Sequence, residues 1–235
     1  MKVKLKNEIL DVEENKSIIE LFKNKINEDK KIIACDINNE IKSLNYILKE
    51  NDNINFVDVT SRDGRRTYVR GLLFIMSMAF NECYPEAFLS VNYQLTNAMY
   101  CEIDNLKVTK EMIENVGNKM KEIVSKKLPI KKVEMSKEEA IKFYEKENSL
   151  RGILQLDNEQ KKGVSLYFCE NYYNYFYGVM PIDTSYINVF DIIPYNDGFL
   201  LRYPDKSNSD VLEPGIVSKK MISTLDEYKD IHRVL

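Results

Sequence analysis

Histidine is almost missing from this chain. Its 235 residues include only one, His232. Histidine supplies the general base of serine-type triads and is a frequent nitrogen ligand of zinc. A site that needs two histidines is therefore excluded, whereas a site built on aspartate, glutamate or tyrosine is not.

Cysteine is also scarce, and its four positions are scattered. Cys35, Cys83, Cys101 and Cys169 form no CxxC pair. Dispersed thiols are typical of reduced, buried cysteines in cytosolic proteins, whereas disulfide frameworks and zinc ribbons show paired spacings. We therefore expect a cytoplasmic protein without disulfides and without a bound metal.

The chain has neither an excess of one charge nor a long apolar run. Its 34 basic and 37 acidic residues leave a net charge of −3, so there is no bulk attraction to nucleic acid or to a membrane. The longest apolar run, Gly71 to Phe80, is well short of the ~20 residues that span a bilayer. Any contact with RNA would need a local basic patch, and no membrane partner is expected.

Residues 1–60 carry the pattern of a small β-grasp domain. The segments "KVKLKN" and "ILDVEE" alternate as strands do, and Ser17 with Glu20 predicts a capping box for a helix through "IIELFKNKI". The runs "KIIACDI" and "INFVDV" predict further strands. This order of hairpin, helix and strands predicts a ubiquitin-like unit.

A larger unit is expected over residues 67–204, after a polar linker at 61–66 that contains an Asp-Gly pair. Apolar periodicity predicts a helix from Tyr68 to Cys83, and Thr109 and Ser136 are typical N-caps of two more helices. Strand patterns surround these helices, mainly at 87–104 and 164–203. The predicted class is α+β with an antiparallel sheet. Residues 205–235 are expected to form a loop and a terminal helix that leads into a further domain.

A β-grasp unit followed by this α+β block resembles the N-terminal half of threonyl-tRNA synthetase, which joins a TGS domain to a second domain shared with alanyl-tRNA synthetases. Within that superfamily the chain looks most similar to the corresponding region of uridine kinase-like nucleoside kinases. The segments that carry this second resemblance are "DGRRTYVRGLLF", "QLTNAMYCEI", "YNYFYGVMP" and "NDGFLLRYP". Their order along the chain, more than any single motif, supports it.

The chain departs from these families where their chemistry lies. The two histidines of the synthetase HxxxH motif align with Arg70 and Phe74, and a later Cys and His align with Phe176 and Met180. Such side chains neither ligate zinc nor activate water. The resemblance therefore implies a degenerate site with no catalytic residue. No GxxxxGK[ST] motif occurs either, so kinase activity, with its ATP and magnesium, would belong to an absent domain.

Three groups of residues remain as candidates for binding. The densest basic cluster consists of Arg62, Arg65, Arg66 and Arg70. It is suited to RNA phosphates or a nucleotide, and it is equally compatible with a solvated junction. Asn97, Tyr100 and Glu102 are predicted to face the cleft of the second unit, either for a small molecule or as structural hydrogen-bonding groups.

The third group lies in "YYNYFYG", which is aromatic at every position except Asn174 and Gly178. Strand alternation places Tyr173, Tyr175 and Tyr177 on one face, where they could pack or stack a base. The opposite face carries Phe176, which we expect to fill the former active-site cleft together with Met180.

These features leave three functional hypotheses. The first is a non-catalytic accessory region of a uridine kinase-like nucleoside kinase that binds RNA or a ligand, or positions the kinase domain. The second is a threonyl-tRNA synthetase-like editing or tRNA-binding fragment. The third is a protein-interaction module that uses a β-grasp edge strand. The expected partners are tRNA or another RNA and a downstream kinase domain, and no cofactor is expected in this chain.

Overall fold

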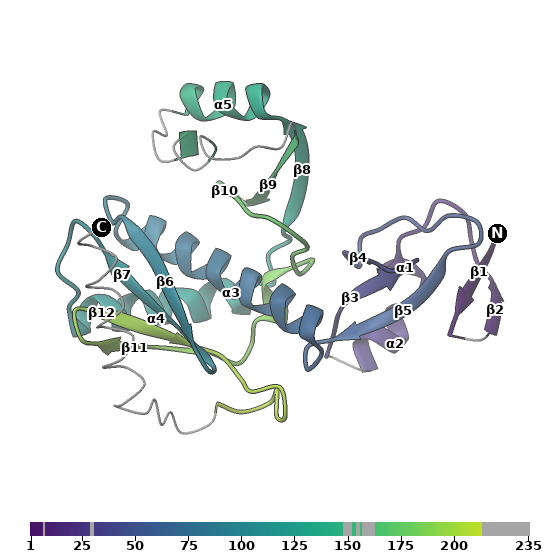
Figure 1. The fold of residues 1–235 in the computed structure, drawn as a ribbon, viewed down its shortest axis with the longest axis horizontal. Coiled ribbons are helices and arrows are strands. Elements are labelled where there is room, and N and C mark those ends of the chain that lie inside the picture. Colours follow the sequence, from purple (N-terminus) through teal and green to yellow (C-terminus); the bar gives the residue numbers. More distant parts are fainter. Residues whose placement is uncertain (7, 29–30, 148–151, 154–155, 157–162, 213–235) are drawn as a thin grey trace, which may run out of the picture.

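Three β-sheets surround one long helix (Figure 1). The computed structural model describes residues 1–6, 8–28, 31–147, 152–153, 156 and 163–212. The long helix is α3, Arg62–Cys83. The mixed composition of helices and mostly antiparallel strands confirms the predicted α+β class.

The N-terminal sheet has the strand order β2-β1-β5-β3-β4. Its central pair, β1 and β5, is parallel, and the other pairs are antiparallel. Ser17 and Glu20 form the predicted capping box, but the helix breaks at Phe22 into two short pieces. The elements are β1 (Lys2–Leu5), β2 (Glu8–Asp11), α1 (Ile18–Leu21), α2 (Lys23–Glu28), β3 (Ile32–Ile37), β4 (Glu40–Lys42) and β5 (Asn53–Asp58).

Helix α3 begins at Arg62, within the segment that we predicted to be a linker and six residues before the predicted helix start at Tyr68. The hydroxyl of Ser61 accepts a hydrogen bond from the backbone N–H of Gly64 at 3.1 Å and caps the helix. The Asp-Gly pair indicated a turn, but Gly64 lies inside α3 and allows this helix to approach the end of β5 closely. A Cβ there would lie 2.0 Å from the carbonyl oxygen of Asp58 at the end of β5. The division of the chain into domains stays a prediction.

A four-stranded antiparallel sheet, β11-β12-β7-β6, packs one face against α3 and α4 (Lys110–Ser125). The rings of Phe80 and Phe199 stack there with centroids 5.5 Å apart. Thr109 caps α4 as predicted, since its side chain accepts from the N–H of Met112. The strands are β6 (Leu89–Leu95), β7 (Ala98–Ile103), β11 (Asp191–Tyr195) and β12 (Gly198–Arg202).

The third sheet, β10-β9-β8, lies beside the middle of α3 and carries α5 (Lys137–Lys146) (Figure 1). Its strands are β8 (Lys131–Ser136), β9 (Gly163–Cys169) and β10 (Tyr172–Tyr175). The strand expected through "YYNYFYG" ends at Tyr175, and Gly178 in the loop beyond it has φ +95°, which no regular strand contains. A 3-10 turn, η1 (Thr184–Tyr186), likewise delays the next strand to Asp191.

Across the described residues, no helix is long and apolar enough to cross a membrane. The predicted terminal helix "TLDEYKDIHRVL", with His232, lies outside the described residues.

Candidate functional site

The first two turns of α3 form one wall of an open basic depression, which we name the arginine concavity. Its arginines lie three and four residues apart, so the helical repeat brings them to one face. The depression has a volume of about 700 Å³. It is lined by Thr60, Ser61, Arg62, Arg65, Arg66, Val69, Arg70, Gln94 and Lys206. All four predicted arginines are thus together, and Lys206 and Gln94 were missed because they arrive from distant strands and loops.

Arg65 makes structural contacts within the protein. Its guanidinium donates a hydrogen bond to Asn97 Oδ1, lies 3.9 Å from the Asp205 carboxylate and sits 5.1 Å from the ring centroid of Tyr203. Hydrogen bonds from Ser207, with a smaller contribution from Arg65, lower the pKa of Asp205 to about 2, so this carboxylate is ionised. Asn97 therefore acts as a structural partner of α3.

The exposed cations of the concavity are Arg62, Arg66 and Lys206. Arg66 lies 3.3 Å from Asp63 in a pair that is about half exposed on both sides, so solvent screens it and the pair is weak. Five basic side chains line the concavity, and the carboxylates that pair with them are Asp63 and Asp205. A positive local potential therefore remains on a chain whose overall charge is negative.

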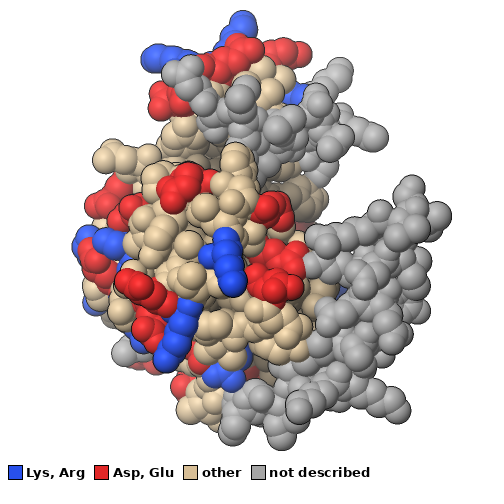
Figure 2. Space-filling view, turned by 90° about the vertical axis from the view of Figure 1, so that its left-hand side faces the viewer, with Lys and Arg blue, Asp and Glu red and all other residues tan. Residues whose placement is uncertain are grey.

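The end of the molecule away from the N-terminal sheet looks different (Figure 2). There Lys and Arg side chains alternate with Asp and Glu, and no broad patch of one sign is visible. Ion pairs also join α4 to α3 and lie along α4, since Lys119 is 3.3 Å from Glu82 and 2.9 Å from Glu122. Charge of one sign is gathered at the concavity and not on this face.

Arg70, at the inner end of the concavity, is half-buried. Its Nη1 donates to the carbonyl oxygen of Val179 at 3.3 Å. Gly178 lies directly on the guanidinium, because a Cβ at that position would be 2.6 Å from Arg70 Cζ. Burial lowers the pKa of Arg70, against favourable interactions with Tyr167 and other neighbours. Arg70 thus holds the loop that follows β10 and is only partly open to a ligand.

Three of the four positions that the resemblance aligned with synthetase ligands, Phe74, Phe176 and Met180, form an apolar plug beside this loop. Phe74 is fully buried, and its ring centroid is 5.9 Å from that of Phe176 and 5.2 Å from that of Tyr172. Met180 is buried in the same core cluster. Among the residues that the structure describes, no three His, Cys, Asp or Glu side chains are placed to hold a metal ion. The plug offers packing and no group that could activate water.

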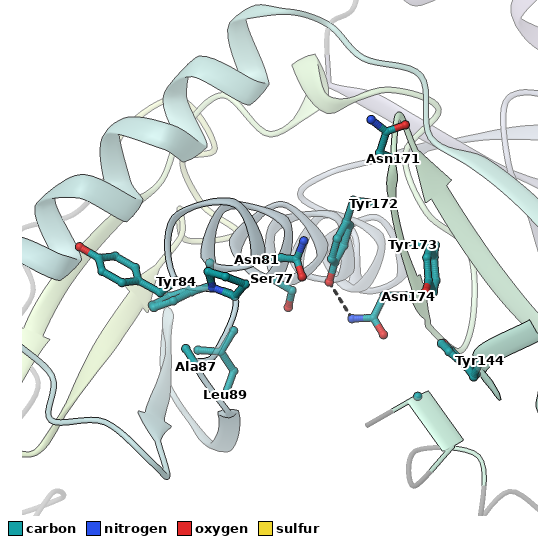
Figure 3. A pocket seen from close by; sticks show the side chains of 13 residues that line it. Ser77, Asn81, Tyr84, Ala87, Leu89, Tyr144, Asn171, Tyr172, Tyr173 and Asn174 are labelled. Carbon is teal, nitrogen blue, oxygen red and sulfur yellow. Dashed lines mark hydrogen bonds between the residues drawn. The ribbon is translucent and has the colours of Figure 1, made fainter. Parts of the chain in front are cut away.

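A second depression, the polar cleft, lies along the C-terminal half of α3 (Figure 3). It has a volume of about 310 Å³, and its polar side chains are amides and hydroxyls. Ser77 and Asn81 of α3 lie on one side and Tyr172 and Asn174 of β10 on the other, with Asn174 Nδ2 donating to the Tyr172 hydroxyl at 2.9 Å. Sequence reasoning missed this cleft, although two polar residues four apart in an apolar helix indicate it.

The prediction that Tyr100 faces the cleft is wrong. Cys101 belongs to the core cluster under α3, so Tyr100, one residue earlier on β7, points to the other face of the sheet. There it is buried and donates to Glu102 Oε1 at 2.8 Å. The tyrosines of β10 and of the loop that follows it also differ in their surroundings. Tyr175 packs in the cluster beneath α5, whereas Tyr177 is 68% exposed.

Comparison with known proteins points to one kind of relative. No family model matches the chain. The threonine–tRNA ligase of Clostridium kluyveri is 26% identical over 151 residues, covering 63% of this chain and 24% of the ligase. That of Thermoplasma volcanium is 27% identical over 181 residues, covering 77% and 27%, and that of Clostridium tetani is 32% identical over 115 residues, covering 48% and 18%. The matched part of the chain is similar to these ligases.

The chain spans about a quarter of the length of the Clostridium kluyveri ligase, at 24%. The comparisons support the synthetase part of the resemblance that the motifs suggested. They add nothing to its nucleoside-kinase part, which stays a prediction.

Proposed function

We propose that this chain is a tRNA-binding accessory region of the synthetase type, without hydrolytic activity of its own. The observation that carries the proposal is the arginine concavity, where five basic side chains gather on one open surface of an acidic chain. Phosphate groups are the ligands that such a surface attracts, and phosphates supply most of the affinity in non-specific RNA binding.

The relatives favour tRNA as the RNA, since the three compared above are named threonine–tRNA ligases. The N-terminal sheet supports the same assignment. Its order β2-β1-β5-β3-β4, with a parallel central pair, is the order expected of a TGS-like β-grasp unit. These relatives favour the synthetase hypothesis over that of a nucleoside-kinase accessory region.

The second candidate function is that of an editing hydrolase of the synthetase type. The geometry of the site does not support this function. Phe74 and Phe176 pack against each other where the synthetase resemblance implies ligands of a reactive centre. Among the described residues that line the adjacent polar cleft, the side chains are amides, hydroxyls and apolar groups. None of these is a general base near neutral pH. Binding without hydrolysis is what this arrangement supports.

Salt-dependent binding of a tRNA transcript, measured by fluorescence anisotropy, tests the proposal. Three exposed cations on three phosphates predict a slope of log K against log salt of roughly −3. The triple variant Arg62→Ala, Arg66→Ala, Lys206→Ala should lose at least about tenfold in affinity at low salt, with a correspondingly flatter slope.

A matched control removes the same charge elsewhere. Lys110→Ala, Lys121→Ala and Lys146→Ala take three exposed lysines from α4 and α5 and should leave affinity within about twofold, because they lie outside the concavity. Equal losses in both triple variants would show that only net charge matters. Absence of tRNA binding by the unaltered protein would refute the proposal and shift weight to a protein-interaction module.

A further inference from the structure

The loop after β10 presents one tyrosine to solvent. Tyr177 is 68% exposed, although its neighbours on both sides are held by the core. Phe176 packs on Phe74, and the backbone N–H of Phe176 donates to the carbonyl oxygen of Ser165 at 3.4 Å. An ordered stretch of backbone therefore presents this ring at the surface.

Two hydrogen bonds fix the other side of the loop. The Tyr167 hydroxyl donates to the carbonyl oxygen of Gly178, and Arg70 donates to that of Val179. Gly178 has φ +95° and touches the Arg70 guanidinium, a conformation and a contact that only glycine allows. The backbone on both flanks of Tyr177 is therefore held in place. A ligand that covers the ring does not have to order the loop first.

The loop that carries the ring adjoins the arginine concavity, and Tyr177 interacts electrostatically with Arg70. Arg70 lines the concavity and lies beneath Gly178, the residue that follows Tyr177. Aromatic rings beside basic side chains are how proteins hold unpaired nucleotides, because each base offers a flat face for stacking while the cations bind its phosphates. A single-stranded nucleotide presents a flat base face and a phosphate close together. A duplex end alone or a peptide combines a flat face and a phosphate less closely.

We propose that Tyr177 stacks an unpaired nucleobase of an RNA whose neighbouring phosphates lie in the arginine concavity. The inference rests on the RNA binding proposed above and narrows its ligand to an RNA that carries a single-stranded segment beside a helix. Arg70 is then a positioning residue, which holds the loop that presents the ring.

Two RNA hairpins of the same stem provide the test, one blunt and one with a four-nucleotide single-stranded extension. Loss of one base stack corresponds to about a 5- to 150-fold loss of affinity. Tyr177→Ala should weaken binding of the extended hairpin by that range and change binding of the blunt hairpin by less than about twofold. Tyr177→Phe, which keeps the ring, should bind both RNAs as the unaltered protein does.

Phe88→Ala is the matched control. Phe88 is an exposed aromatic, at 52%, that precedes β6 at the end opposite the Thr96–Asn97 turn. Its removal should leave both RNAs unaffected. A 2-aminopurine in the extension gives a direct reading, since stacking quenches its fluorescence. Quenching is expected with the unaltered protein and Tyr177→Phe, and not with Tyr177→Ala.

The outcomes separate the two proposals. Equal affinity of the unaltered protein for both hairpins, without quenching, would overturn the role of Tyr177 and leave phosphate binding intact. Equal weakening of both hairpins by Tyr177→Ala would overturn that role as well. Failure of the unaltered protein to bind either hairpin would overturn RNA binding itself, and the stacking proposal with it.

Discussion

Replacement of Gly178 by alanine should destabilise the protein far more than one added methyl group ordinarily does. The residue has φ +95°, and its new Cβ would lie 2.6 Å from Arg70 Cζ and 2.9 Å from Arg70 Nε. An alanine in the left-handed region costs about 1–2 kcal/mol. Displacement of the guanidinium also breaks its bond to Val179, and a hydrogen bond from a charged donor contributes about 1.5–3 kcal/mol.

The two effects together predict a loss of about 2.5–5 kcal/mol in the free energy of unfolding, measured by urea denaturation. Gly163→Ala is the control. Its Cβ would meet nothing closer than the Met135 carbonyl oxygen at 3.9 Å, so the change should stay within about 0.5 kcal/mol.

A double-mutant cycle isolates the steric part of this effect. Arg70→Ala removes the guanidinium that the new methyl group would strike, so Gly178→Ala should cost about 1.5–3 kcal/mol less in that background. What remains is the backbone strain. If Gly178→Ala has the same stability as the unaltered protein, or if the cycle shows no coupling, the reasoning about the loop is refuted.

The remaining predictions concern a helix cap and two buried thiols. Thr109→Ala removes the acceptor for the N–H of Met112 at the start of α4 and should lower the free energy of unfolding by about 1 kcal/mol, measured by urea denaturation; no change would mean that the cap is replaced by water. Burial raises the pKa of Cys35 and of Cys101 to about 12, above the usual thiol value of 9.0. Since the unfolded thiols ionise first, stability should be constant below pH 9 and fall as the pH rises from there toward 12. Urea midpoints at pH 8 and pH 10 measure this slope, and Cys101→Ala should reduce it; an unchanged slope would exclude Cys101 as its source.

Sequence reasoning succeeded where the cause is local. Thr109 and Ser136 were identifiable as caps because the acceptor and the N–H groups that it serves lie within one turn. The common face of the arginines was not predicted, because residues 61–66 were expected to be a linker and not the first turn of a helix. Sequence reasoning failed for Gly64. A side chain at this position would clash with the carbonyl oxygen of Asp58 at the end of β5, and such a tertiary contact leaves no local pattern in the sequence.

Long-range register explains the other errors. Alternation alone says that Tyr100 and Cys101 face opposite sides of β7, and only the packing of α3 decides which side is covered. Lys206 joins the concavity because the chain after β12 returns to the start of α3, which no local pattern shows. The expectation for Phe176 was that it fills the cleft together with Met180; its contact with Phe74, with ring centroids 5.9 Å apart, was not predicted, because it joins a helix to a loop about a hundred residues further along the chain.

Arg70, Phe74 and Ser77 follow one another along a single side of α3, and this order has a consequence for any bound molecule. Arg70 and Ser77 are separated by seven residues, or about 10 Å of helix rise. Phe74 stands between them and is covered by Phe176 and Tyr172. The arginine concavity and the polar cleft are therefore neighbours divided by a wall of aromatic rings. A small ligand fits into the arginine concavity or into the polar cleft, but not into both. Only an extended molecule that is longer than the width of this wall can reach both depressions.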